Sequence, residues 1–233
     1  NVTVEDQINP VAICQDITIS LDANGNATIT AAQIDNGSND ACGIDSITVA
    51  PSAFTCANIG ANTVTLTVTD NNGNVSTCNA TVTIEDNTNP TANCQNITVQ
   101  LDANGNAVIT AADIDNGSFD NCSSGATLTL SASETSFDCS EIGTNTVTLT
   151  VTDIQGNSSS CEAIVTVEDT VSPVAICQSI TIQLDANGQA VITAADIDNG
   201  SSDNCSDSNS GLTFSLSQTE FDCTDPIVST VTL

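Results

Sequence analysis

The sequence predicts an all-β chain built from tandem sandwich repeats, each about 80 residues long with about seven short strands. The segment LDANGNA begins at Leu21 and again at Leu101, and it returns as LDANGQA at Leu184. Apolar and polar residues alternate in runs rich in Val, Thr and Ile, which is the period of a half-buried strand. Turn signals recur every 8–12 residues, a spacing typical of β-sandwiches.

The repeats also set the expected domain boundaries. The recurring segments are offset by 80 and 83 residues. Residues 1–10 match the close of a repeat, so we expect there the last strand of a preceding repeat and a linker. Repeat 1 then covers 11–90, repeat 2 covers 91–173, and repeat 3 covers 174–233 without its last strands. The chain is therefore interpreted as part of a longer tandem array.

Within repeat 1 the elements are expected in a fixed order. VAICQDITISL supplies the first strands, a DANG turn follows, and NATIT forms the next strand. The polar loop AAQIDNGSND leads to the strand GIDSITVA, the short segment FTC and the strand NTVTLTVTD. An NNGN turn and STCNATVTIED complete the repeat. Asn24-Gly25 and Asn104-Gly105 are typical of type I′ hairpin turns.

The charge composition excludes several classes of function. The chain has 29 acidic residues and no Lys, Arg or His, which gives a formal charge of −29. The commonest general base and the amine nucleophile are thus missing, so we expect no enzyme activity. Nothing can neutralise nucleic-acid phosphates, and anionic membranes should repel the chain. Membrane insertion is not expected either, because no apolar stretch is long enough.

The chain has eleven cysteines, and they recur at corresponding positions in each repeat. Each complete set of four allows three pairings, and zinc is the alternative use for thiolates. The chain lacks both C-x-x-C pairs and histidine, which disfavours zinc. Such a density of cysteines in small β-domains instead indicates disulfides and therefore an oxidising, extracellular location.

One stretch resembles a known extracellular module. FDCSEIGTNTVTLTVTDIQGNSSSCEAIVTVED, at 137–169, is similar to the second half of a hyalin repeat, an immunoglobulin-like domain. The matching motif combines an apolar residue and Gly before a strand, then T-D-x-x-G-N, a Cys and a final V-x-V strand. It is carried by Phe137, Gly143, Asp153, Gly156, Asn157 and Cys161, and by Phe54, Gly60, Asp70, Gly73, Asn74 and Cys78. The second cysteine pair and Leu149, where the family usually has Tyr, depart from the pattern.

The resemblance implies an immunoglobulin-like sandwich and a set of disulfides. In such modules the first and last strands run parallel, which favours Cys14–Cys78 and Cys94–Cys161. The middle strands are then expected to be stapled by Cys42–Cys56 and Cys122–Cys139. Cys205 and Cys223 are also expected in disulfides, and Cys177 is expected to pair with a cysteine outside 1–233.

The acidic residues recur at corresponding places in each repeat. Each linker carries Glu-Asp before a Pro, each polar loop carries two Asp residues, and the T-D-x-x-G-N turn adds one more. In a sandwich the loops after the second and sixth strands return to the end where the chain enters, so these carboxylates should converge at each junction. The expected metal ligands are Glu5, Asp6, Asp35, Asp40, Asp70, Glu85, Asp86, Asp115, Asp120, Asp153, Glu168, Asp169, Asp198 and Asp203.

Clustered carboxylates repel one another unless a cation binds between them. Oxygen ligands on flexible loops suit Ca²⁺, so we expect one or two Ca²⁺ ions per junction. The alternative is that these carboxylates are simply solvated. Asp22, Asn24 and Asn26 alternate as in calcium loops, but no bidentate Glu follows, which favours a turn. Asp22 could still assist the next junction.

These observations predict a secreted structural filament or stalk of a bacterial surface or matrix. Its tandem, calcium-stabilised, disulfide-stapled repeats are expected to self-associate into an array. One alternative is an adhesin whose repeats bind surface glycans or proteins. The lack of Trp and Tyr disfavours it, because aromatic residues dominate binding hot spots. The other alternative is the accessory stalk of a secreted enzyme.

Overall fold

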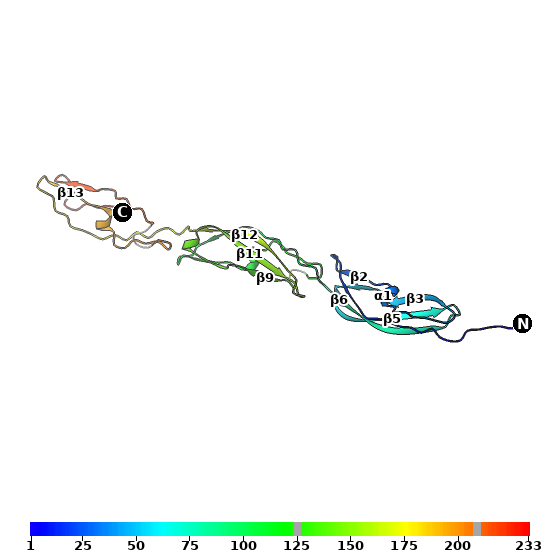
Figure 1. Ribbon diagram of the computed structural model, residues 1–233. Helices are drawn as coiled ribbons and strands as arrows, with labels where there is room; N and C mark the ends of the chain where they lie inside the picture. The colour runs from blue at the N-terminus through cyan, green and yellow to red at the C-terminus, as the bar shows by residue number, and fades with distance from the viewer. Residues whose placement is uncertain (124–126, 207–210) are drawn as a thin grey trace. The chain divides into compact units, whose positions relative to one another are not determined.

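The computed structural model describes residues 1–123, 127–206 and 211–233, and it confirms the all-β fold class (Figure 1). Contacts divide the chain into two compact units. The first comprises Asn1–Cys94, Asp115–Ser131 and Leu149–Cys161. The second comprises Gln95–Ile114, Ala132–Thr148 and Glu162–Leu233. Within the described residues, no helix is long and apolar enough to cross a membrane.

Repeat 1 consists of a four-stranded sheet and a two-stranded sheet. The larger has the order β1-β6-β5-β3, with β1 at Ile17–Ser20, β6 at Val75–Glu85, β5 at Gly60–Asp70 and β3 at Ile44–Ala50. The smaller pairs β2 (Asn26–Thr28) with β4 (Ala53–Thr55). Strand β1 runs parallel to β6, as the family resemblance implies, while β5 and β6 form an antiparallel pair.

The core of repeat 1 follows from strict alternation along the two long strands. Val64, Leu66 and Val68 of β5 are fully buried, whereas the intervening threonines are partly exposed. Ala80, Val82 and Ile84 alternate in the same way along β6. Phe54 of β4 and Ile34 complete the cluster. Burying each such side chain contributes about 1.5–3 kcal/mol, which holds the two sheets together.

Two local expectations were wrong. The polar loop after β2 contains a short helix, α1 (Ala31–Ile34), whose capping box at Thr30 and Gln33 places Ile34 in the core. Asn24-Gly25 forms a turn but not a type I′ hairpin, because no non-glycine residue that the structure describes has a positive φ. The strands that flank this turn, β1 and β2, also belong to different sheets.

Repeat 1 has six named strands, and isolated bridges at Val11–Asn39 and Cys14–Asp35 stand where a further strand was expected.

Repeat 2 reproduces this architecture. Its larger sheet has the order β7-β12-β11-β9, with β7 at Ile97–Gln100, β12 at Ser158–Glu168, β11 at Gly143–Thr152 and β9 at Thr129–Ala132. Strands β8 (Asn106–Val108) and β10 (Ser136–Asp138) form the smaller sheet. The 3-10 turns are η1 (Cys56–Asn58) in repeat 1, and η2 (Ala111–Asp113) and η3 (Cys139–Glu141) in repeat 2.

In repeat 3 the named elements are β13 (Gln189–Val191), α2 (Ala194–Ile197) and β14 (Glu220–Asp222). Leu184 is 42% exposed, whereas its counterparts Leu21 and Leu101 are 5% and 3% exposed. In repeats 1 and 2 those leucines donate a backbone hydrogen bond to the last residue of the long final strand, Glu85 or Glu168. The described part of repeat 3 contains no strand of that kind, so its apolar face is only partly covered.

The part of the chain that the structure describes contains four disulfides, and two of them differ from the expected pairing. Cys14–Cys78 and Cys94–Cys161 agree with the expectation: each joins the segment just before the first strand to the long last strand of one repeat. The expected Cys42–Cys56 and Cys122–Cys139 bonds were wrong. Cys56 instead pairs with Cys122, and Cys139 pairs with Cys205, so both bonds cross from one repeat to the next. Within the described residues Cys42, Cys177 and Cys223 are unpaired and exposed, so the disulfide expected for Cys223 was wrong, whereas the one expected for Cys205 is present.

The corrected pairing has an energetic consequence. Each crossing bond spans 66 residues, compared with 14 for the expected Cys42–Cys56 bond. By loop entropy, closing 66 residues is worth roughly 4 kcal/mol and closing 14 roughly 3 kcal/mol. The crossing bonds therefore stabilise the chain at least as well as local staples would, and they also join successive repeats covalently.

Peptide mapping under non-reducing conditions tests this pairing. Trypsin has no site in the chain, so the digestion needs a protease that cleaves after Asp and Glu. We expect peptide 46–70, which contains Cys56, to be linked to peptide 121–134, which contains Cys122. A link between 41–45 and 46–70 instead would restore the local Cys42–Cys56 pairing and contradict the structure.

Candidate metal site and disulfide latch

Three carboxylates meet in the first unit, on Asp86, Asp120 and Asp153. One oxygen from each lies within 4.8 Å of the others. Asp86 is 3% exposed and Asp153 is 5% exposed, which is unusual for ionisable residues. Asp120 is partly buried. The group combines the linker after β6, the loop before Cys122 and the turn between β11 and β12.

Strand alternation explains why two of these carboxylates are buried. Along β6, Ala80, Val82 and Ile84 face the core, and Asp86 continues the same series one step beyond the strand. Asp153 likewise follows Val151 on the buried face of β11. A period of two residues thus places a carboxylate on the buried face at the end of each strand.

The T-D-x-x-G-N motif fixes the position of Asp153. The backbone N–H of Asn157 donates to Asp153 Oδ1 at 2.8 Å, and the Asn157 amide donates to Oδ2 at 2.8 Å. The same amide donates to the backbone carbonyl of Asp86 at 3.0 Å. Asn157 therefore ties the turn of repeat 2 to the linker that precedes it. In repeat 1, Asn74 binds Asp70 and the Asp6 carbonyl in the same manner.

Asp86 and Asp120 each leave one oxygen without a partner. Asp86 Oδ1 accepts from Thr88 N–H at 3.1 Å and from the Asn121 amide at 3.2 Å. Asp120 Oδ2 accepts from Cys122 N–H at 3.1 Å. Asp86 Oδ2 and Asp120 Oδ1 are buried with no hydrogen-bond partner among the described residues. Asn121 Oδ1 and Ser123 Oγ are in the same condition.

These features fit a hard cation better than solvated acids. Two unit charges at 4.8 Å, the upper limit of the separations here, repel by roughly 3.5 kcal/mol at an effective dielectric constant near 20, and three pairs act here. The chain has no Lys, Arg or His to balance them. Buried acceptors without partners are rare in folded proteins because each costs about 1–3 kcal/mol. A calcium ion would satisfy both requirements, since it takes six to eight oxygen ligands in irregular geometry.

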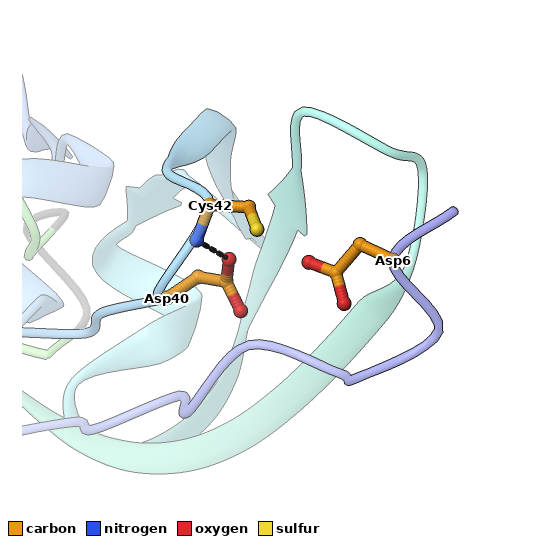
Figure 2. A group of neighbouring side chains, drawn as sticks. All are labelled: Asp6, Asp40 and Cys42. Carbon is orange, nitrogen blue, oxygen red and sulfur yellow. Dashed lines mark hydrogen bonds between the residues drawn. The ribbon is translucent and has the colours of Figure 1, made fainter. Parts of the chain in front are cut away.

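The corresponding group in repeat 1 differs in composition. Asp6, Asp40 and Cys42 bring ligand atoms within 4.8 Å of one another, and Figure 2 shows the two carboxylates and the thiol turned toward one another. Cys42 N–H donates to Asp40 Oδ1 at 2.7 Å. A hydrogen bond with Asp6 and the charge of that carboxylate raise the pKa of the Cys42 thiol. Asp70, which corresponds to Asp153, is buried but does not belong to this group.

In the second unit, Asp169 and Asp203 occupy the positions of Asp86 and Asp120. The Asn204 amide donates to Asp169 Oδ1 at 3.2 Å, as Asn121 does to Asp86. Asp203 Oδ1 and Asn204 Oδ1 are buried without a partner among the described residues. The pattern of unsatisfied oxygens therefore recurs at the next pair of repeats.

The glutamates of the expected ligand set point elsewhere. Glu5, Glu85 and Glu168 are exposed. Glu85 and Glu168 end the long strands β6 and β12, one residue before Asp86, which is buried, and Asp169, which is partly buried, so alternation turns the glutamates to the solvent side. Glu168 Oε2 accepts from Gln100 at 2.7 Å. The structure therefore groups Asp6 and Asp86, not Glu5 and Glu85, with other carboxylates.

Three more expected ligands organise their own loops. Asp35, Asp115 and Asp198 each accept a hydrogen bond from the backbone N–H of the serine three residues later, at 3.0–3.1 Å. Each also bridges to the first cysteine of its repeat. Hydrogen bonds from Ser38 and Ser201 lower the pKa of Asp35 and Asp198, respectively. None of the three belongs to a described carboxylate group.

The pKa of Asp70 also lies below its ordinary value. Burial raises it, but hydrogen bonds from the side chain and backbone of Asn74 and from the backbone of Asn72 and Gly73 outweigh that effect. Asp70 is therefore held ionised by its own turn.

The DANG turn contributes to the junction through its backbone. Asp22 Oδ1 accepts from Asn24 and Asn26 N–H groups at 2.9 Å, so its carboxylate shapes the turn. Its backbone carbonyl accepts from the Asn121 amide at 3.1 Å. Asp22 thus meets the next repeat through its carbonyl oxygen, and this contact recurs between Asp102 and Asn204 at 3.0 Å.

A disulfide lies beside this contact, and we call the combination the latch. In the first unit it comprises the Gly25 turn, Cys56 and the Asp120-Asn121-Cys122 tripeptide; in the second it comprises the Gly105 turn, Cys139 and Asp203-Asn204-Cys205. Cys56 Sγ lies 3.7 Å from Gly25 O and 3.5 Å from Asn121 O, and Cys139 shows the same distances to Gly105 and Asn204. The latch is therefore one structural unit used twice.

Sequence reasoning missed the latch, although a signal was present. The spacing from Cys42 to Cys56 is 14 residues and from Cys122 to Cys139 is 17, so this interval varies. The interval from Cys56 to Cys122 equals that from Cys139 to Cys205, at 66 residues. This constant spacing across the repeat boundary is compatible with a bond between repeats. The tripeptide Asp-Asn-Cys, present at 120–122 and 203–205, was a second signal.

Comparisons with known proteins give structural likeness only. No family model and no curated protein matches the chain. A crystal form of extracellular cadherin domains 1–4 of protocadherin gamma B7 is 17% identical, with a TM-score of 0.35 over 90% of this chain and 63% of that one. The EC1-2 structure of human mucin-like protocadherin is 14% identical, with a TM-score of 0.34 over 67% of this chain and 97% of that one. The chain thus spans less than two thirds of the gamma B7 fragment, and scores this low carry no conclusion about function.

Gly105→Ala tests the close packing of the latch. A Cβ at Gly105 would lie 2.5 Å from Cys139 Sγ and 3.0 Å from the Asn204 carbonyl oxygen, and Gly105 has φ +75°. Gly117→Ala is the matched control, because Gly117 has φ +77° but no atom within 4 Å of its added Cβ. Both variants carry a backbone cost of about 1–2 kcal/mol. We expect only Gly105→Ala to lose much of the Cys139–Cys205 bond, measured by non-reducing peptide mapping. Equal disulfide content in the two variants would contradict the packing described here.

Proposed function

We propose that the chain is a secreted structural array of immunoglobulin-like repeats whose successive members are joined by a Ca²⁺ ion and a disulfide latch. The repeats cover 11–90, 91–173 and 174–233, after a linker at 1–10. The single observation that carries the proposal is the group formed by Asp86, Asp120 and Asp153, in which buried carboxylate oxygens converge without an internal counter-charge.

The identity of the cation follows from the donor set. All three donors are carboxylate oxygens, which excludes the sulfur- and nitrogen-rich sites typical of zinc. They lie on loops and a turn rather than on one rigid element, which suits the variable coordination of Ca²⁺ better than the strict octahedron of Mg²⁺. Asp86, Asp120 and Asp153 would hold the ion, and its charge would offset their mutual repulsion.

The composition and disulfides support an extracellular location. Four disulfides fit an oxidising compartment, and a chain without basic residues cannot screen its own charge in the absence of cations. Recurrence of the latch at two places favours a repetitive, extensible architecture over a single active site. We therefore propose a stalk or filament of the hyalin-repeat type on a bacterial surface or in its matrix, with self-association as its main interaction and surface glycans as further partners.

An adhesin that binds through every repeat is less well supported. Phe119 is 55% exposed, which is the kind of aromatic side chain a binding surface needs. Its counterparts in the other repeats, on the isolated bridges with Val11 and Val174, are Asn39 and Ser202. The exposed aromatic residue is thus not repeated, whereas the carboxylate and latch positions are.

Asp120→Asn tests the calcium site, because its effect on the melting temperature should have opposite signs in EDTA and in Ca²⁺. In EDTA the variant should melt at a higher temperature than the parent, because removing one charge relieves repulsion within the group. In excess Ca²⁺ it should melt at a lower temperature, because the parent gains about 2.7 kcal/mol at a Ca²⁺ concentration 100 times its Kd and the variant gains much less. Differential scanning calorimetry measures both melting temperatures, and isothermal titration should show at least a tenfold loss of affinity.

Glu162→Gln is the matched control. It also removes one negative charge, but Glu162 is exposed on β12 and lies outside the carboxylate group. Its melting temperature should shift in the same direction in EDTA and in Ca²⁺. If Asp120→Asn behaves like Glu162→Gln, or if Ca²⁺ leaves the parent unchanged, the carboxylates are merely solvated and the calcium proposal fails.

A further inference from the structure

Residues 120–123 form a loop that carries both a member of the carboxylate group and a cysteine of the latch. The loop belongs to no helix or strand, and it follows an isolated bridge at Phe119. Asp120 N–H donates to the Ser123 carbonyl at 3.3 Å, and Cys122 N–H donates to Asp120 Oδ2 at 3.1 Å. These bonds fix the shape of the loop, but they do not attach it to the rest of the first unit.

The attachment comes from the disulfide and from one amide. Cys122 is bonded to Cys56, which begins η1 directly after β4. The Asn121 amide donates to three oxygens at 3.1–3.3 Å, those of the Asp22 carbonyl, the Asp86 carboxylate and the Thr88 hydroxyl. One amide has two hydrogens for these three acceptors, so the contacts cannot all be full hydrogen bonds. The covalent bond to Cys56 is therefore the strongest tie between this loop and the elements around it.

The other two carboxylates are positioned without the latch. Asp86 continues the buried series of β6, and Asp153 is held by two hydrogen bonds from Asn157. Neither segment contains a cysteine of this disulfide. Opening the disulfide therefore removes the positioning of one carboxylate, Asp120, and leaves that of the other two.

Electrostatics determine where Asp120 goes once the bond is open. Its carboxylate is repelled by those of Asp86 and Asp153, and the chain has no Lys, Arg or His to hold it in place. A bound Ca²⁺ ion reverses this force, because it attracts all three carboxylates to one point. The disulfide and the ion thus favour the same position of the loop.

We propose that the Cys56–Cys122 disulfide controls the affinity of this carboxylate group for Ca²⁺. With the bond closed three carboxylates face the ion, and with the bond reduced only Asp86 and Asp153 remain in place. The inference rests on the proposed calcium site and adds its regulation. Coupling between two equilibria is reciprocal, so bound Ca²⁺ favours the closed bond by the same factor. The chain then binds Ca²⁺ weakly in a reducing compartment and tightly once it reaches an oxidising one.

The opening of the latch is a two-electron exchange with glutathione. One glutathione thiolate attacks a latch sulfur, which forms a mixed disulfide and releases the other latch sulfur as a thiolate. A second glutathione thiolate attacks the glutathione sulfur of the mixed disulfide, and glutathione disulfide leaves. The protein disulfide is thereby reduced to two thiols, which take up the two glutathione thiol protons, while two glutathione molecules are oxidised to one glutathione disulfide. Oxidation of the latch by glutathione disulfide is the reverse reaction.

Calcium titration of cysteine variants tests the coupling. Isothermal titration with CaCl₂ compares the 233-residue chain with the double variant Cys56→Ser/Cys122→Ser. We expect the double variant to bind at least about tenfold more weakly, within the roughly 5–150-fold range of coupled sites. The matched control is Cys139→Ser/Cys205→Ser, which opens the equivalent bond in the second unit. Its affinity at the Asp120 group should stay within about twofold of the parent, as expected for independent sites.

Asp120→Asn shows whether the disulfide acts through this carboxylate. In the parent the substitution should weaken Ca²⁺ binding, but in the Cys56→Ser/Cys122→Ser background it should have less than about a twofold further effect. An equal penalty for Asp120→Asn in both backgrounds would overturn the inference. Unchanged Ca²⁺ affinity of the double cysteine variant would also overturn it and leave the calcium site standing. Absence of Ca²⁺ binding to the parent would instead overturn the proposed function.

A redox titration of the unsubstituted chain excludes a folding defect of the variants. The chain is equilibrated with mixtures of reduced and oxidised glutathione in saturating Ca²⁺ or in EDTA, free thiols are trapped, and peptide mapping gives the fraction of closed Cys56–Cys122 bonds. Ca²⁺ should shift the equilibrium constant with glutathione about tenfold toward the disulfide, which corresponds to about 30 mV for a two-electron couple. Asp120→Asn should abolish this shift. Equal midpoints in Ca²⁺ and EDTA, for a chain that binds Ca²⁺, would contradict the coupling.

Discussion

The repulsion among buried carboxylates is the constraint on which the rest of this molecule depends. Period-two alternation along β6 and β11 places Asp86 and Asp153 on the buried face, and the loop before Cys122 adds Asp120. In most proteins an arginine or lysine would balance such a group, but this chain contains neither. Either the repulsion among these carboxylates destabilises the folded state, or the group binds a cation from the surroundings. The buried oxygens of Asp86 and Asp120 that lack partners favour the second solution.

The disulfide of the latch compensates for the limited stability of small hydrophobic cores. The cores of these repeats consist mainly of Val, Leu, Ile and Ala, with one buried Phe each in repeats 1 and 2. Small cores bury limited apolar area, so small domains of this kind commonly need additional staples. Two disulfides, Cys14–Cys78 and Cys94–Cys161, stabilise single repeats. The other two, Cys56–Cys122 and Cys139–Cys205, join one repeat to the next. Two of the four disulfides among the described residues thus join successive repeats rather than stabilise a single one.

Sequence reasoning succeeded where the signal is local and periodic, and it failed where a choice between repeats was needed. The alternation of Val64, Leu66 and Val68 was sufficient to predict a half-buried strand. The Cys42–Cys56 bond was wrong because the argument assumed that each repeat closes its own bonds. Glu85 was placed with the ligands because the acidic pair was treated as a unit, although alternation sends its two members to opposite faces. Strand periodicity applied one residue further would have separated them.

The Asp120-Asn121-Cys122 tripeptide shows how both solutions share a single short segment. Asp120 supplies one member of the carboxylate group, Asn121 donates to Asp86 and to the Asp22 carbonyl, and Cys122 closes the disulfide. The backbone N–H of Cys122 donates to Asp120, so the ionic and covalent elements are coupled by a direct hydrogen bond. Breaking the disulfide would free the loop that positions Asp120, and without the proposed cation the carboxylate on that loop repels its two neighbours. Each element therefore pre-organises the other, because both depend on the same three residues holding one conformation.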